Sequence, residues 1–154
     1  MTIKKVLAYC IALLIIGCDS KKEEEKLCVA FACDIASVRL KLKFVDINTN
    51  QDLLFSSNAP YHKSDLKVYN NLNNQELSFG IDSTDKSNRY IILSSTISQT
   101  FRVKLADKPQ DLISVETKFI NEGCCGNMQL KNLKLNQTTV CTSCSDIQPI
   151  VLLK

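Results

Sequence analysis

Cysteines are the residues of this chain whose number and spacing offer the most chemistry. There are eight of them in 154 residues, and Cys141 and Cys144 form a C-x-x-C motif. Thiols at this spacing bind zinc or exchange disulfides when a reducing compartment keeps them free. A four-thiolate zinc site that adds Cys28 and Cys33 also has plausible spacing. In an oxidising compartment the same thiols pair as structural disulfides, so the compartment decides their chemistry.

The N-terminus indicates that compartment. A short basic head precedes an apolar run, residues 6–17, which is shorter than the roughly 20 helical residues needed to span a bilayer. This pattern is typical of a secretory signal peptide. The run ends in Ile-Ile-Gly-Cys at residues 15–18, which resembles the lipobox of bacterial lipoproteins. The resemblance implies cleavage between Gly17 and Cys18 and attachment of lipid, with palmitate as a typical acyl chain, to Cys18.

A charged stretch follows this cysteine and predicts a tether. Residues 19–26 (DSKKEEEK) are nearly all charged, so they cannot bury enough apolar area to offset the entropy lost on ordering. Two or more acyl chains hold a protein stably at a membrane. We therefore expect a lipid-anchored protein of the cell envelope, in the outer membrane, at its periplasmic leaflet or at the cell surface. An ordinary secretory signal and an uncleaved anchor are the alternatives.

The cysteine count favours disulfides in the exported protein. With Cys10 removed in the signal and Cys18 lipidated, an even number remains for an oxidising compartment. The disulfide candidates are Cys28, Cys33, Cys124, Cys125, Cys141 and Cys144. The adjacent pair Cys124 and Cys125 does not bond easily to itself, because its geometry is far from the relaxed disulfide range. Several connectivities stay open, and we expect at least one bridge from an end of the domain to this pair.

Oxygen-bearing side chains at alternate positions have the spacing of calcium-loop ligands. They are Asp46, Asn48, Asn50 and Asp52. The loop needs Gly at its sixth position and Glu at its twelfth, where this chain has Gln51 and Ser57. Asn and Asp also favour turns for backbone reasons. We therefore predict an ordinary turn here, a similar turn at Asp82, Asp85 and Asn88, and no metal or cofactor site.

Catalytic signatures are not evident in the sequence. His62 is the one histidine and lies in a Pro-Tyr-His-Lys turn, whereas a triad needs three oriented partners. No Gly-x-Ser-x-Gly motif is present. We predict no enzyme and no catalytic residues. A hydrolase with an unrecognised carboxylate pair stays open as an alternative, because sequence alone does not reveal such pairs.

Composition excludes some partners. Loss of the two signal lysines leaves nearly balanced charges, without the clustered basic excess that nucleic-acid binding requires. The chain has no Trp and few Tyr, which is a poor endowment for stacking sugars or bases. We therefore expect no nucleic-acid partner.

The chain from residue 37 onward alternates apolar and polar residues as half-buried strands do. The predicted strands are residues 38–44, 53–55, 66–68, 77–81, 90–93, 101–105, 113–119 and 128–135. The uninterrupted apolar run at 90–93 predicts a central strand, and a phase shift around Lys131 and Asn132 predicts a bulge or bend. Cys141 and Cys144 fall after the last predicted strand, with an extended tail behind them. Seven or eight short strands indicate an all-β antiparallel β-sandwich.

Two resemblances support this fold. The first strand ends in Asp46 and leads through an Asn/Thr-rich turn to a short apolar strand, which resembles the opening hairpin of transthyretin-like and carboxypeptidase-regulatory-like domains. The lipobox, a C-x4-C before the first strand, a Cys-Cys-Gly turn and late cysteines are similar to small bacterial lipoproteins of unassigned function with a transthyretin-like or Ig-like β-sandwich. The resemblance implies a fold and no activity.

These patterns together predict three parts: a signal peptide at 1–17, the lipidated Cys18 and tether at 18–27, and a disulfide-bonded β-sandwich at 28–154. We expect a non-catalytic binding or accessory module whose partner is another envelope protein, a peptide or a glycan. The alternatives are an extracytoplasmic metal-binding or thiol-redox protein and a hydrolase. A binding module predicts an exposed apolar patch or an open sheet edge, and an enzyme predicts a polar cleft near His62 or Asp82.

Overall fold

The alternating pattern after residue 37 does form a strand with one buried face. The computed structural model describes residues 36–121, 125–144 and 148–154. Strand β1 (Val38–Val45) buries its apolar residues, while Arg39 and Lys41 between them are exposed. Eight more strands and the short 3-10 helix η2 (Lys63–Asp65) complete the regular structure of this part of the chain. The all-β prediction is confirmed, with nine strands where seven or eight were expected.

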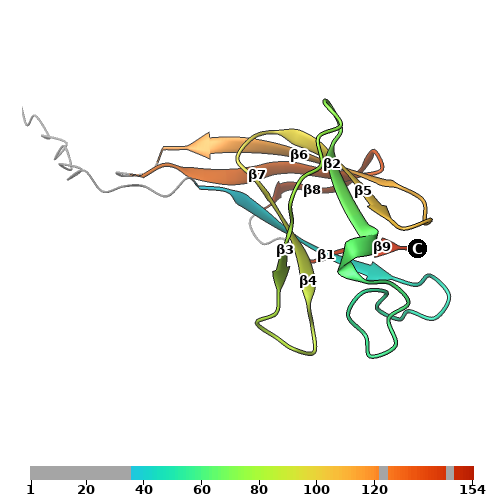
Figure 1. Ribbon diagram of the computed structural model, residues 1–154. Coiled ribbons are helices and arrows are strands. Elements are labelled where there is room, and N and C mark those ends of the chain that lie inside the picture. The colour runs from blue at the N-terminus through green and yellow to red at the C-terminus, as the bar shows by residue number, and fades with distance from the viewer. Residues whose placement is uncertain (1–35, 122–124, 145–147) are drawn as a thin grey trace, which may run out of the picture.

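Four strands form the first sheet. Its order is β3 (Gly80–Asp82), β4 (Tyr90–Ser95), β1 and β9 (Ile150–Leu153). Strand β4 is antiparallel to both of its neighbours, so the prediction of a central strand at 90–93 is confirmed. Strand β9 is parallel to β1, and the sheet is therefore not purely antiparallel. Figure 1 shows β9 beside the end of β1, next to the C-terminus.

Five antiparallel strands form the second sheet. Their order is β2 (Leu66–Asn70), β5 (Gln99–Leu105), β6 (Asp111–Ile120), β7 (Asn127–Leu135) and β8 (Thr138–Cys144). Every neighbouring pair is antiparallel. In Figure 1 this sheet lies above the first one, and the long strands β6 and β7 extend to the left of the view, past the start of β1.

The two sheets face each other across one hydrophobic core, as a β-sandwich requires. The largest fully buried side chains of the four-stranded sheet are Leu40, Leu42, Phe44, Ile91, Leu93 and Leu152. Those of the five-stranded sheet are Leu66, Val68, Phe101, Leu105, Ile113 and Leu133. All belong to one contiguous cluster of packed residues. Burial of this apolar area, roughly 25 cal/mol per Å², is the main force that holds the sheets together.

The predicted bulge is present in β7. Glu116 pairs with Asn132 while its neighbour Thr117 pairs with Leu130, so Lys131 is an extra residue in the ladder. The side-chain alternation of a strand would place residues 130 and 133 on opposite faces. The extra residue resets the alternation, and both Leu130 and Leu133 are buried.

Two predicted strands are wrong or shortened. Residues 53–55 form a turn, because the Asp52 carboxylate accepts the backbone N–H groups of Leu54 and Phe55 and so holds the chain out of a ladder. Residues 77–79 are irregular, and the regular strand β3 begins only at Gly80. Apolar residues in these segments still pack on the core. An apolar segment that is buried but irregular has the same pattern of apolar residues in the sequence as a strand.

Two predictions for the end of the chain are also wrong: Cys141 and Cys144 do not follow the last strand, and residues 150–153 of the expected tail behind them form a strand. Asn136 and Gln137 have φ angles of 49° and 71°, which is the backbone of a tight two-residue hairpin turn. The turn brings residues 138–144 back as β8, so Cys141 and Cys144 lie in a strand and not beyond the last one. In β9, Ile150 and Leu152 are buried between the sheets.

Candidate binding surface

The cysteines in the described part of the chain are disulfide-bonded. Cys141 and Cys144 bond to each other, are half-buried and pack against the hydrophobic core. Cys125 takes part in a disulfide as well. The expectation of disulfides is therefore confirmed for these three residues. The remaining predicted site residues lie outside the described residues: Gly17, Cys18, Cys28, Cys33 and Cys124.

The turn predicted at Asp46 is confirmed. One oxygen of Asp46 accepts the N–H groups of Asn48 and Thr49 at 2.9 and 2.8 Å. The Thr49 backbone N–H is the largest cause that holds the pKa of Asp46 below its usual value. Asn50 has a φ of 56°, a conformation that Asn tolerates in turns. Among the described residues, no group of three metal-ligating side chains comes together.

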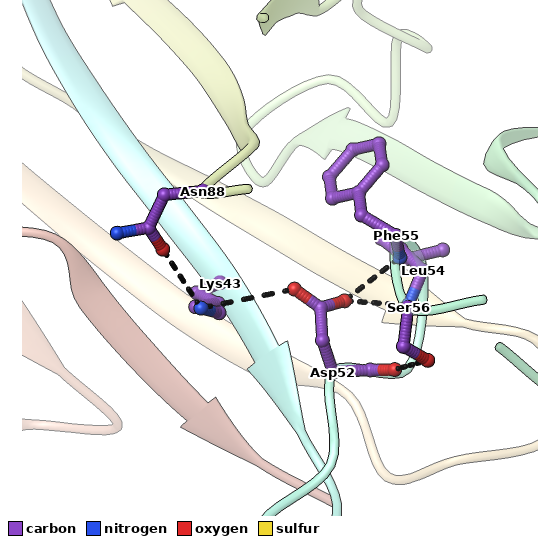
Figure 2. A network of polar contacts seen from close by, with 6 residues as sticks. All are labelled: Lys43, Asp52, Leu54, Phe55, Ser56 and Asn88. Atoms are coloured by element: carbon purple, nitrogen blue, oxygen red, sulfur yellow. Dashed lines mark hydrogen bonds and ion pairs between the residues drawn. The ribbon is translucent and has the colours of Figure 1, made fainter. Parts of the chain in front are cut away.

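A polar network joins two loops across β1 (Figure 2). The Nζ of Lys43 donates to the Oδ1 of Asn88 at 3.1 Å and lies 4.0 Å from the Oδ2 of Asp52. The other oxygen of Asp52 accepts the N–H groups of Leu54 and Phe55, both at 2.8 Å. The network therefore links the β3–β4 loop, through a side chain of β1, to the turn that follows β1. Both carboxylate oxygens of Asp52 therefore have partners inside the protein.

Asp82 is held in the ionised state. Its Oδ1 accepts the hydroxyl of Thr84 at 2.6 Å, and its Oδ2 lies 2.9 Å from the Nζ of Lys41. The Thr84 hydroxyl first, and then Lys41, hold the pKa of Asp82 far below its usual range. The same lysine lies 5.6 Å from the ring centre of Tyr90. A general acid needs a carboxyl group with a raised pKa. The pKa of Asp82 is shifted in the opposite direction.

His62 is exposed and lies directly before η2. Its backbone N–H donates to the Oδ2 of Asp65 at 2.8 Å, which closes the turn at the start of the 3-10 helix. The neighbouring Tyr61 hydroxyl bonds to Asp107 at 3.3 Å. These contacts hold the segment in place and bring no nucleophile toward the imidazole.

Two surface hollows border the sandwich. One of about 690 Å³ lies where the starts of β1 and β7 meet the ends of β6 and β8, and its charged lining residues are Arg39, Lys118 and Lys131. The Nζ of Lys131 lies 2.6 Å from the carboxylate of Glu116. The other, of about 440 Å³, lies between residues 77–80 and strands β4 and β5 and has no charged lining residue. Neither hollow includes His62 or Asp82, where an enzyme of this chain was expected to have its cleft.

The outer side of β9 is an open sheet edge. Strand β9 ends its sheet, and no strand of the described residues pairs with its far side. The Lys154 N–H donates to the Val45 carbonyl at 2.9 Å, and the Lys154 carbonyl accepts from Ile47 at 3.0 Å. Backbone groups of successive strand residues point to alternate sides. Val151 and Leu153 therefore direct their N–H and C=O groups to the open side.

Exposed aliphatic side chains adjoin this open edge. Val151 and Leu153 are 47% and 57% exposed. We call these two residues the β9 patch. Sequence reasoning missed it by interpreting residues 150–153 as a tail. The signal that could have found it is the uncharged run Ile-Val-Leu-Leu directly after Pro149, since proline commonly precedes a strand.

The three other sheet edges are protected, in contrast to β9. Strand β8 contains an extra residue, Val140, opposite the step from Leu133 to Lys134, and such bulges disrupt edge pairing. Strand β2 is covered by the chain that follows it, because the Leu77 N–H donates to the Val68 carbonyl at 2.8 Å. Strand β3 has only three residues. Within the described residues, β9 is thus the regular, uncharged and uncovered edge.

Comparison of the chain with protein-family models, with curated proteins and with solved structures finds no match. In the part of the chain that the structure describes, no helix is long and apolar enough to cross a bilayer.

Proposed function

We propose that this protein is a lipid-anchored component of a bacterial cell envelope that binds a partner without catalysis, through the β9 patch and the edge beside it. The observation that carries the proposal is the open edge of β9 with its exposed aliphatic side chains. Exposed apolar groups beside unpaired backbone groups are the two features by which one chain adds a strand to another. The partner is therefore a protein or peptide segment rather than a glycan.

The location is supported by the sequence and by the cysteines. The basic head, the apolar run and the Ile-Ile-Gly-Cys end at residue 18 are typical of an exported lipoprotein. Disulfides such as Cys141–Cys144 form and persist in oxidising compartments. Anchoring through Cys18 and disulfide bonding of the domain are consistent with one address, the cell envelope.

The thiol-redox alternative has no support from the position of its motif. Redox-active C-x-x-C cysteines have a thiol pKa lowered by features such as a helix N-terminus, whereas Cys141 and Cys144 lie in β8. Both pack against the core, as structural disulfides do. The hydrolase alternative needs a carboxyl group with a raised pKa, whereas local hydrogen bonds lower the carboxyl pKa of four described residues: Asp46, Asp82, Asp85 and Glu116.

One experiment tests location and surface together. The full chain, with a photo-reactive amino acid in place of Leu153, is expressed in a bacterial host, irradiated in intact cells and purified from membranes. Intact mass is then measured before and after reduction and alkylation. We expect loss of residues 1–17, a lipid mass on Cys18, alkylation of the other cysteines only after reduction, and a cross-linked protein adduct.

The matched control carries the photo-reactive group at Lys104, an exposed residue of β5 in the other sheet, and should give no adduct. A lipid-free mass would contradict the anchor. Thiols that alkylate without reduction, or a bound metal mass under native conditions, would favour the metal or redox alternative. Equal adducts from positions 104 and 153, or none from 153, would contradict the β9 surface.

A further inference from the structure

We propose that the partner of β9 is β9 of a second copy of this chain, paired antiparallel about a two-fold axis that passes beside Leu152. This inference names the partner for the binding role proposed above and rests on that role. It joins two four-stranded sheets edge to edge into one continuous sheet. The argument depends on the direction of the backbone groups, on charge and on the length of the N-terminal chain.

The open backbone groups of β9 match those of a second β9 without any offset. Val151 and Leu153 direct their N–H and C=O groups outward, while the alternate residues bond to β1. In an antiparallel ladder, two opposite residues of a hydrogen-bonded pair exchange both of their bonds. A two-fold axis at Leu152 places Val151 opposite Leu153 of the second copy, and Leu153 opposite Val151 of the second copy. Every open group of the strand is then paired.

Charge places no obstacle to this pairing. Residues 150–153 carry no charge, so no like charges meet when the strand faces its own copy. The nearest cations are occupied within each subunit, since Lys154 pairs with Asp111 and Lys43 lies near Asp52. The exposed side chains of Val151 and Leu153 lie on one face of β9 and contact their counterparts across the new pair.

The symmetry of this contact favours a second copy over a different protein. An isologous contact uses the same patch on both subunits, and the open groups of β9 are themselves symmetric about Leu152. The two-fold places the N-terminal ends of the domains on opposite sides of the pair. The chain from Cys18 to Ala36 spans up to about 60 Å when extended, so both copies can reach one membrane.

The test is the mass of the full chain in detergent, measured by light scattering after size exclusion. Val151→Pro removes an outward N–H, together with the valine side chain, and leaves the β1–β9 hydrogen bonds intact, and proline is tolerated at such edge positions. Val151→Thr is the matched control, because it keeps the N–H and the β-branched shape. We expect the unchanged chain and Val151→Thr to be dimers, and Val151→Pro to be a monomer with unchanged circular dichroism.

Amide hydrogen exchange keeps the inference testable if Val151→Pro does not fold. In the unchanged chain, exchange at the Val151 and Leu153 amides should slow as protein concentration rises. Two results overturn the β9 pair. In the first, the unchanged chain stays monomeric up to about 100 μM, which is about 100 times a Kd of about 1 μM. In the second, folded Val151→Pro is still a dimer. A monomer that cross-links at position 153 to a different protein overturns the second copy as partner and leaves the binding role in place.

Discussion

Three aspartates among the described residues organise turns. Asp46, Asp52 and Asp82 each accept a backbone N–H from two residues further along the chain. This is the Asx turn, in which the side chain replaces a backbone acceptor. Their alternate or clustered spacing in sequence thus reflects the residues that turns prefer. At the residue scale, Asp46 and Asp52, two of the side chains that first suggested metal binding, accept backbone N–H groups of the turns that they begin.

The pKa of Asp82 gives a prediction at this scale. Thr84→Val removes the hydroxyl that is the largest cause of the lowered pKa, so the carboxyl pKa should rise toward its ordinary value. Because the folded-state pKa is depressed, Asp82 stabilises the fold above its ordinary pKa of 3.8, and the contribution is lost as pH falls through the folded value. An NMR titration of the Asp82 carboxyl carbon measures the shift.

Ser83→Ala is the control for this titration, since the Asp82 carboxylate bonds to Thr84 and Lys41 and not to the Ser83 hydroxyl. It should leave the midpoint unchanged. If Thr84→Val also left it unchanged, the hydroxyl would have no part in holding Asp82 ionised.

At the element scale, the edge strands of the two sheets differ in how regular their backbones are. Strand β8 is bulged at Val140, and its Ser143 has a φ of 53°, which no regular ladder accommodates. Strand β9 has neither irregularity, although it is equally peripheral. Edge strands are commonly guarded against pairing with other chains. A regular, aliphatic edge left open beside guarded ones is the feature from which both proposals start.

Two adjacent leucines test whether β9 is a strand with one buried face. Leu152 is 1% exposed and its neighbour Leu153 is 57% exposed. Leu152→Ala should lower the free energy of unfolding by about 2–5 kcal/mol, because it leaves a cavity in the core. Leu153→Ala should change it by less than about 0.5 kcal/mol. Urea unfolding of dilute protein measures both, and similar losses for the two variants would contradict the assigned register.

The two sheets are joined, at the scale of the whole molecule, by an ion pair as well as by the core. Lys154 follows β9 in the four-stranded sheet and pairs with Asp111, the first residue of β6 in the five-stranded sheet. The lysine side chain is 2% exposed and the aspartate 11%. Asn136 also donates to Asp111, at 2.8 Å. The start of β6, the β7–β8 turn and the end of β9 thus meet at one buried carboxylate.

Removal of this lysine should destabilise the whole sandwich. Lys154→Met leaves the Asp111 charge buried without its partner, which costs about 3–5 kcal/mol, and adding Asp111→Asn should restore part of the loss. Lys131→Met breaks the exposed pair with Glu116 and serves as the control, with a change below about 1 kcal/mol. Urea unfolding of the two single variants and the double variant measures these changes in the free energy of unfolding. Equal losses at Lys154 and Lys131 would show that burial does not strengthen the cross-sheet pair.

Local patterns in the sequence determined much of this protein. Alternation of apolar and charged residues determined β1, β5 and β6, since a strand buries every second side chain. The phase shift at Lys131 determined the bulge, because Leu130 and Leu133 must both reach the core. The sequence also determined that Asp46 and its neighbours form a turn, which depends on bonds between residues two or three apart.

Only the tertiary structure decided which strands are neighbours and which edge stays open. Residues 150–153 pair with β1, more than 100 positions earlier in the chain, and no local pattern encodes a contact between segments so far apart. Tertiary contacts likewise placed Cys141 and Cys144 in β8, converted residues 150–153 of the expected tail into β9, and left Leu53 and Leu54 buried without a ladder. The β9 patch arises for the same reason. A short apolar run shows that it must be buried on one side, but its partner strand and its exposed side follow only from the packing of the two sheets.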